Sequence, residues 1–96
     1  MNNNLSDKER KYLGRVKRLP CSVCDAAPPS SAHHSKQHNQ YTCVALCYDC
    51  HQNEQLGWHG AKRMWNIKKM DMNDALNVTL KRLNDRVDER FTGFID

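Results

Sequence analysis

The pattern of hydrophobic and polar positions predicts helices towards both ends of the chain and short strands between them. Segment 6–19 is expected to form a basic helix that Pro20 stops, with Ser6 and Glu9 as a capping box at its start. Its apolar side chains lie near helical spacing, at Tyr12, Val16 and Leu19. Residues 1–5 precede this helix and are expected to be disordered.

The middle of the chain alternates apolar segments with turn-forming ones. Residues 32–34 and 41–46 are expected to be strands, separated by the polar loop 35–40. A short helix is expected to begin around Cys47 and to carry His51. These short elements, arranged as strand, loop, strand and helix, predict a small mixed core.

Two helices are predicted after residue 60. Residues 61–69 should form a short one, with Met64, Trp65 and Ile67 facing inward. Asp71 or Asn73 can cap a longer one, whose apolar stripe is expected to pack against the core. The stripe consists of Leu76, Leu80, Leu83, Val87 and Phe91. The fold class is therefore predicted to be α+β, a single domain over 1–96 with a metal-stabilised core at 20–60 and helices on both flanks.

Composition explains why a metal is expected in this core. The chain has 96 residues, of which only 39% are hydrophobic, and a domain of this size commonly needs a metal, a disulfide or a partner for stability. No segment approaches the roughly 20 apolar residues of a membrane span, and the start of the chain lacks a secretory signal. We therefore expect a cytoplasmic protein, of a bacterium or a phage-infected host cell, with no membrane partner.

Cysteine spacing supplies the strongest chemical signal. The pattern C-x2-C-x22-C-x2-C comprises Cys21, Cys24, Cys47 and Cys50. Each pair places two thiolates on one tight turn, and two such turns complete the tetrahedron of a closed structural Zn²⁺ site. In a reducing compartment this pattern indicates a metal site rather than disulfides. Cys43 is left over and is expected to be a buried free thiol.

Four histidines cluster around the cysteine pairs: His33, His34, His51 and His59. Adjacent strand positions point to opposite faces, so His33 and His34 are expected to diverge unless a twist or bulge brings both into one pocket. Two or three of these imidazoles could hold a divalent cation, and one could act as a general base. His38, in the polar loop, is assigned no role.

The ordered combination of motifs resembles a known family. The segments C-S-V-C, A-H-H, V-A-L-C-Y-D-C-H and G-W-H-G resemble the HNH (ββα-metal) endonucleases. The chain is most similar to the small phage-type members related to the recombination enhancement function (Ref) nucleases. The resemblance covers about residues 15–70, and it implies a β-hairpin and a helix that grip one catalytic metal.

The resemblance also implies roles for individual residues. His34 would be the general base, and His33, His51 and His59 would bind the catalytic metal, Mg²⁺ or another divalent ion. The Asn of the family name normally lies on the strand before the last cysteine pair and orients the base. That strand contains no Asn here, Asn39 lies before it, and Thr42 stands in its place.

The charge distribution favours a polyanionic partner. Residues 1–70 carry 11 Lys and Arg against 5 Asp and Glu, and residues 71–96 carry 4 against 6, so the positive field lies with the cysteines and histidines. Candidate DNA contacts, chosen by charge and proximity, are Arg15, Lys17, Arg18, Lys36, Lys62 and Arg63.

The leading hypothesis is a metal-dependent DNA endonuclease that hydrolyses phosphodiester bonds. The resemblance adds phage recombination or DNA processing as its setting and a recombination protein such as RecA as a partner. The alternative is a non-catalytic zinc-stabilised module that binds DNA or a protein. Oligomeric state is open, since the C-terminal apolar stripe could serve a dimer as well as the core.

Overall fold

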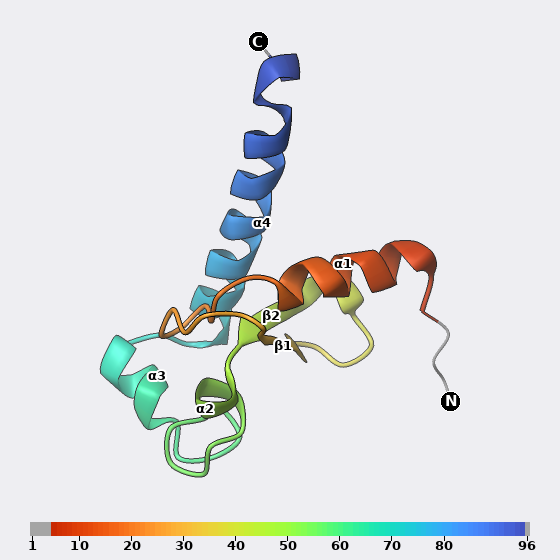
Figure 1. The fold of residues 1–96 in the computed structure, drawn as a ribbon. Helices are drawn as coiled ribbons and strands as arrows, with labels where there is room; N and C mark the ends of the chain where they lie inside the picture. The colour runs from red at the N-terminus through yellow and green to blue at the C-terminus, as the bar shows by residue number, and fades with distance from the viewer. Residues whose placement is uncertain (1–4, 96) are drawn as a thin grey trace.

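A two-stranded antiparallel sheet surrounded by helices forms the computed structural model, which describes residues 5–95 and the side chains of residues 5–85 (Figure 1). The elements in chain order are α1 (Asp7–Lys17), β1 (Ser31–His34), the 3-10 helix η1 (Gln40–Thr42), β2 (Cys43–Leu46), α2 (Tyr48–His51), α3 (Arg63–Lys68) and α4 (Met72–Ile95). The α+β class is confirmed, and both expected strands are present, although the second begins at Cys43 rather than Tyr41 because residues 40–42 form η1. Of the segment 1–5 expected to be disordered, residues 1–4 lie outside the described part.

The first helix begins as its sequence predicts. The Ser6 side chain accepts a hydrogen bond from the Glu9 N–H at 3.1 Å, and the Glu9 carboxylate accepts one from the Ser6 N–H at 2.8 Å. This capping box satisfies two of the N–H groups that a helix start leaves free. The helix ends at Lys17, slightly earlier than expected, and Leu19 is buried just beyond it.

The second strand lies at the centre of the core. β1 and β2 pair with Ala32 opposite Ala45, and all four residues of β2 are buried. Because side chains alternate along a strand, β2 contributes to two separate apolar clusters. Val44 and Leu46 pack beside the cysteine pairs and α3, whereas Cys43 and Ala45 pack against α1 and α4.

The short helix α3 corrects one sequence expectation. Trp65 is buried and its indole N–H donates to the Cys50 carbonyl at 2.8 Å, and Met64 packs at the edge of the same cluster. Ile67, which was expected to face inward, is 69% exposed. Side chains two residues apart on a helix point in directions that differ by about 200°. Because Trp65 points into the core, Ile67 points to solvent.

The last helix is capped by Asp71, not Asn73. The Asp71 carboxylate accepts from the Asp74 N–H, and the Asp74 carboxylate accepts from the Asp71 N–H, both at 2.9 Å. Such reciprocal bonds fix the start of α4.

The face of α4 that packs is rotated from the predicted stripe. Ala75, Thr79 and Leu83 are its buried residues among those with described side chains, Leu76 is partly buried, and Leu80 is 39% exposed. The expectation that Leu80 packs in the core is wrong, because the Thr79 hydroxyl turns its own face of the helix towards β2. Val87 and Phe91, the rest of the stripe, lie outside the described side chains.

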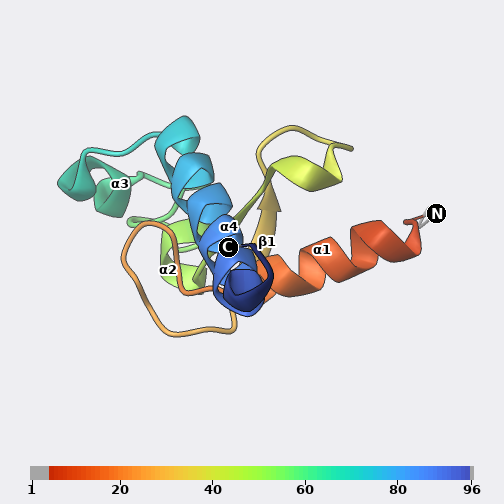
Figure 2. The same ribbon diagram turned by 90° about the horizontal axis from the view of Figure 1, so that it is seen from above.

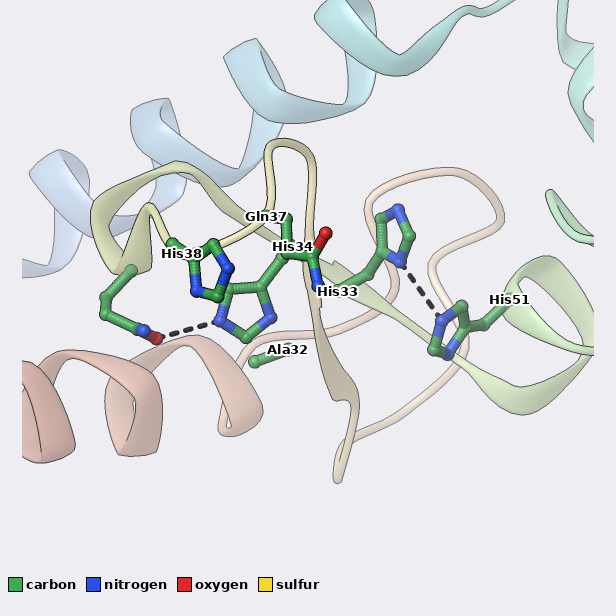
Figure 3. A pocket seen from close by; sticks show the side chains of 7 residues that line it. Ala32, His33, His34, Gln37, His38 and His51 are labelled. Atoms are coloured by element: carbon green, nitrogen blue, oxygen red, sulfur yellow. Dashed lines mark hydrogen bonds between the residues drawn. The ribbon is translucent and has the colours of Figure 1, made fainter. Parts of the chain in front are cut away.

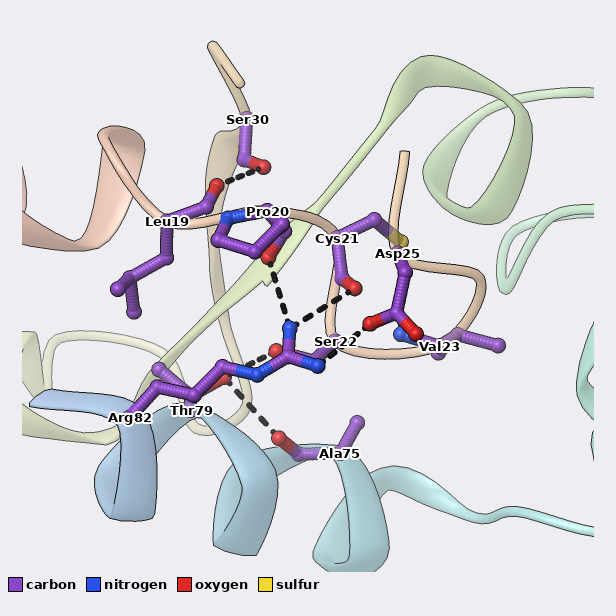
Figure 4. A network of polar contacts seen from close by, with 10 residues as sticks. All are labelled: Leu19, Pro20, Cys21, Ser22, Val23, Asp25, Ser30, Ala75, Thr79 and Arg82. Atoms are coloured by element: carbon purple, nitrogen blue, oxygen red, sulfur yellow. Dashed lines mark hydrogen bonds and ion pairs between the residues drawn. The ribbon is translucent and has the colours of Figure 1, made fainter. Parts of the chain in front are cut away.

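Helix α4 also binds the first cysteine turn, through the side chain of Arg82. It rises from the middle of the fold, with α1 and α3 to either side in both views (Figures 1 and 2). The Arg82 guanidinium donates to the backbone carbonyls of Pro20 and Cys21, at 3.4 and 3.2 Å, and pairs with the Asp25 carboxylate (Figure 4). In the described range, residues 5–95, no helix combines the length and apolar character needed to cross a membrane.

Candidate metal centres and histidine cleft

The four paired cysteines converge as their spacing predicts. One sulfur atom from each of Cys21, Cys24, Cys47 and Cys50 lies within 4.8 Å of the others. The Cys24 and Cys47 sulfurs are 3.6 Å apart, far beyond the roughly 2.05 Å of a disulfide. Two sulfurs bound tetrahedrally to one Zn²⁺ at about 2.3 Å would lie about 3.8 Å apart. The cluster is therefore compatible with a structural metal such as zinc.

The backbone around the cysteines favours thiolates. The Val23 N–H points at the Cys21 sulfur and the Cys50 N–H at the Cys47 sulfur, each at 3.4 Å. Both donors lie within the same tight turn as the sulfur they contact. N–H groups aimed at sulfur stabilise a negatively charged acceptor more than a neutral one, which suits the deprotonated ligands that a metal requires.

Because the four sulfur atoms lie close together, their thiol groups have different pKa values. The hydrogen bond from the Cys50 thiol lowers the pKa of Cys21 to about 4. The same hydrogen bond raises the pKa of Cys50, and burial raises that of Cys24 to about 11. One thiolate thus forms readily, and a bound cation would supply the charge that the remaining deprotonations need.

Cys43 is separate from this cluster. It is fully buried on β2, with its side chain on the α1 and α4 side of the sheet. Burial raises the pKa of its thiol to about 11, so it stays protonated and unreactive. The expectation of a buried free thiol is confirmed.

Three histidines form a second cluster. One ring nitrogen from each of His33, His51 and His59 lies within 4.8 Å of the others, and the ring centroids are 4.8 to 5.2 Å apart. The His33 Nδ1 and His51 Nε2 atoms approach to 3.1 Å. Two imidazole nitrogens bound tetrahedrally at about 2.0–2.1 Å would be separated by about 3.3 Å. The His33 and His51 nitrogens are thus close to the separation that a shared cation requires, and the three residues form a candidate site for one cation.

Local structure brings the three rings together. His33 lies on β1, and His51 ends α2 directly after Cys50, so the cysteine cluster fixes its place. The His59 N–H donates to the His51 carbonyl at 3.2 Å, which folds the following loop back over α2. This loop needs Gly57, because a Cβ there would meet the His51 carbonyl group at 2.8 Å.

The environment of the triad keeps imidazoles neutral. Burial, followed by the proximity of His51, His59 and His34, lowers the pKa of His33 to about 4. Burial and the nearby His59 also lower the pKa of His51. The His51 Nδ1 atom is buried and has no hydrogen-bond partner among the described residues. Neutral imidazole is the form that binds metals.

The fourth histidine of the set points away from the triad. His34 lies next to His33 on β1, and the two rings diverge (Figure 3), as strand alternation predicts. Both nevertheless line one open cleft of about 530 Å³. The polar residues around that cleft are His33, His34, Gln37, His38, Gln40 and His51. Two residues of the candidate metal site, His33 and His51, therefore share one cavity with the separate imidazole of His34.

Sequence reasoning overlooked part of this cleft. Gln40 contacts the His34 Nε2 atom through its side-chain oxygen at 2.8 Å, and Gln37 and His38 complete the rim. Only the topology could have indicated these residues: a short loop between two paired strands must lie next to the end of the first strand. Periodicity carries no information on a loop of this kind.

The predicted DNA-contacting residues lie on three segments. Arg15 and Lys17 belong to α1 and Arg18 caps its end. Lys36 is exposed in the loop that carries Gln37. Lys62 and Arg63 open α3, with the Lys62 ammonium 4.2 Å from the Trp58 ring centroid. Of these segments, the loop at Lys36 is the one that forms part of the cleft rim.

Comparison with protein-family models, curated proteins and solved structures gives no match for this chain.

Proposed function

We propose that this protein is a metal-dependent DNA endonuclease with an HNH-type (ββα-metal) core. The observation that carries the proposal is the cleft lined by two of the three clustered imidazoles, His33 and His51, and by the separate imidazole of His34. The order β1, β2 and α2, with histidines at the end of β1 and the end of α2, agrees with that core. Phosphodiester hydrolysis needs these two parts, a cation site and a base.

The triad fits a transition metal better than Mg²⁺. All three candidate ligand atoms, from His33, His51 and His59, are imidazole nitrogens, whereas Mg²⁺ prefers oxygen ligands. A divalent cation bound there would stabilise negative charge on the scissile phosphate and on the leaving oxygen. We therefore expect Mn²⁺ or Ni²⁺ to support the reaction better than Mg²⁺.

His34 would act as the general base. Its ring lies in the cleft but outside the triad, so a cation bound by the triad does not occupy its nitrogens. In this role it accepts a proton from the attacking water as the new P–O bond forms and the bond to the leaving oxygen breaks.

The basic surface supports a nucleic-acid substrate. Exposed lysines and arginines on α1, the loop at Lys36 and the start of α3 would contact phosphates. A role in phage recombination or DNA processing, with a recombination protein such as RecA as partner, belongs to the same proposal. Its basis is the resemblance of motifs described above.

A plasmid-nicking assay tests the proposal. Supercoiled DNA is incubated with the zinc-loaded protein and Mg²⁺, Mn²⁺ or Ni²⁺, and nicked and linear products are measured. We expect metal-dependent nicking that falls by roughly 10²- to 10⁴-fold in His34→Ala, the usual contribution of a general base. His51→Ala should lose activity through lost binding of the second metal, seen by metal analysis.

His38→Asn is the matched control. It removes an imidazole that is assigned no role, and Asn tolerates the left-handed backbone at this position, where φ is 72°. This variant should nick like the wild type, and circular dichroism and the zinc held by the four cysteines should be unchanged in all three variants. DNA binding without cleavage under every metal would refute the enzyme and favour the non-catalytic module, and nicking that persists in His34→Ala would refute the assigned base.

A further inference from the structure

The side chain of Gln40 makes the one hydrogen bond that fixes the His34 ring within the described residues. The Gln40 Oε1 atom lies 2.8 Å from the His34 Nε2 atom. His34 is the last residue of β1 and Gln40 the first of η1, so the contact spans the loop between the strands. An exposed imidazole without such a partner would rotate among several orientations.

The loop holds Gln40 in place independently of this contact. The Ser35 hydroxyl donates to the Thr42 carbonyl at 2.7 Å, and the Thr42 hydroxyl and N–H both donate to the Asn39 carbonyl, at 3.0 and 3.3 Å. These bonds close the loop on both sides of Gln40. Its side chain therefore starts from a fixed backbone position.

Helix α1 supports the same segment from outside. The Tyr12 hydroxyl donates to the Tyr41 carbonyl at 3.3 Å, and the two rings meet edge to face with centroids 4.9 Å apart. η1 is thus held against α1 rather than projecting freely into solvent. A glutamine presented from such a support can act as a rigid acceptor.

The acceptor atom determines which nitrogen of His34 carries the proton. A neutral imidazole has one N–H donor and one lone pair. Because the amide oxygen of Gln40 accepts from Nε2, the hydrogen resides on Nε2 and the lone pair on Nδ1. The hydrogen bond made by one ring nitrogen sets the role of the other.

We propose that Gln40 is a positioning residue that holds the His34 ring in one orientation and keeps Nδ1 as its proton acceptor. The catalytic consequence rests on the proposed nuclease function, whereas the tautomer itself does not. Gln40 would thereby supply the orientation that the family's Asn supplies from the neighbouring strand, where this chain has Thr42.

Nitrogen-15 NMR of the histidine rings tests the tautomer without any substrate. In the full-length, zinc-loaded protein, at a pH where His34 is neutral, we expect the His34 proton on Nε2. Gln40→Ala should give a mixture of both tautomers. Gln40→Glu keeps an oxygen acceptor at the same position and should retain the Nε2–H form. Gln37→Ala is the matched control, since Gln37 lines the same cleft without a described bond to His34, and it should match the wild type.

Kinetics then measures the consequence for cleavage. Gln40→Ala should lower kcat roughly tenfold, less than the loss expected without the base, with KM for an oligonucleotide duplex unchanged and with recovery in Gln40→Glu. A wild-type proton on Nδ1, or an unchanged tautomer in Gln40→Ala, would overturn the inference. DNA binding without cleavage under every metal would instead overturn the nuclease function, and nicking that does not depend on His34 would overturn only its role as the base. Both outcomes leave the tautomer result standing, so the failures are distinguishable.

Discussion

The buried hydroxyl of Thr79 joins three parts of the fold, and its removal should be costly. Its Oγ1 atom accepts from the Ala45 N–H at 3.2 Å. The same atom donates to the Ala75 carbonyl at 3.0 Å and lies 2.7 Å from the Ser22 hydroxyl (Figure 4). With the Ser22 hydroxyl as a second donor, this one oxygen has all its hydrogen-bonding capacity used. Thr79 is fully buried, so no water can replace these bonds.

We predict that Thr79→Val lowers the free energy of unfolding by about 2–4 kcal/mol. Valine keeps the shape and the helix propensity, but it leaves the Ala45 N–H and the Ser22 hydroxyl buried without partners. Each such group costs about 1–3 kcal/mol, with the lower figure for Ser22, whose hydroxyl can turn. For a domain of 96 residues this corresponds to a melting temperature lower by roughly 10–25 °C.

Urea unfolding of the zinc-saturated protein, followed by far-UV circular dichroism, measures this loss. Thr42→Val is the matched control: its hydroxyl bond to the Asn39 carbonyl is exposed, so water can replace it and the loss should stay below about 1 kcal/mol. In a cycle with Ser22→Ala, the double variant should lose about 1 kcal/mol less than the sum of the single losses. A Thr79→Val loss no larger than that of the control would refute the reasoning.

Three further predictions concern the metal, the glycines and acid. A chelator should unfold the protein cooperatively and Zn²⁺ should restore it, as circular dichroism would show, since structural zinc sites contribute about 10–16 kcal/mol; retained structure in the chelated protein would contradict this. Gly14→Ala, with open space around its Cβ in α1, should raise stability by about 0.5–1 kcal/mol, whereas Gly57→Ala should lower it in the same urea titration. With the triad free of metal, the pKa of His33 is about 4 against an ordinary 6.5, so between these values the unfolded chain holds a proton that the folded chain lacks. Stability should therefore fall as the pH drops from 6.5 to about 4, and the slope measured by urea unfolding should be flatter in His33→Gln.

Residue spacing predicted the parts of the protein whose geometry is local. Two residues between cysteines define a turn, and the Ser6 and Glu9 pair defines a helix start, so both were readable without a structure. The set His33, His51 and His59 came from the resemblance of motifs, and the structure brings these three histidines together.

The features that the sequence did not predict depend on contacts between residues far apart in the chain. The rotation of α4 depends on a bond between Thr79 and Ser22, 57 residues apart, which exposes Leu80 against the apolar pattern. The orientation of Ile67 likewise follows from the indole bond of Trp65 to α2. The position of Gln40 in the cleft depends on the conformation of its loop, which no pattern of residues in the sequence predicts.

The covering of β2 has a consequence for how the protein behaves among copies of itself. A strand edge with free N–H and C=O groups is a template for pairing with another chain. The Ala45 carbonyl accepts from the Ser22 N–H at 2.9 Å, and the Ala45 N–H is taken by a side chain of α4. The outer edge of β2 is therefore blocked at its midpoint by a turn on one side and a helix on the other. A sheet of two four-residue strands with this edge blocked cannot extend from β2 into an intermolecular sheet, which lets such a small domain keep an apolar strand without promoting aggregation.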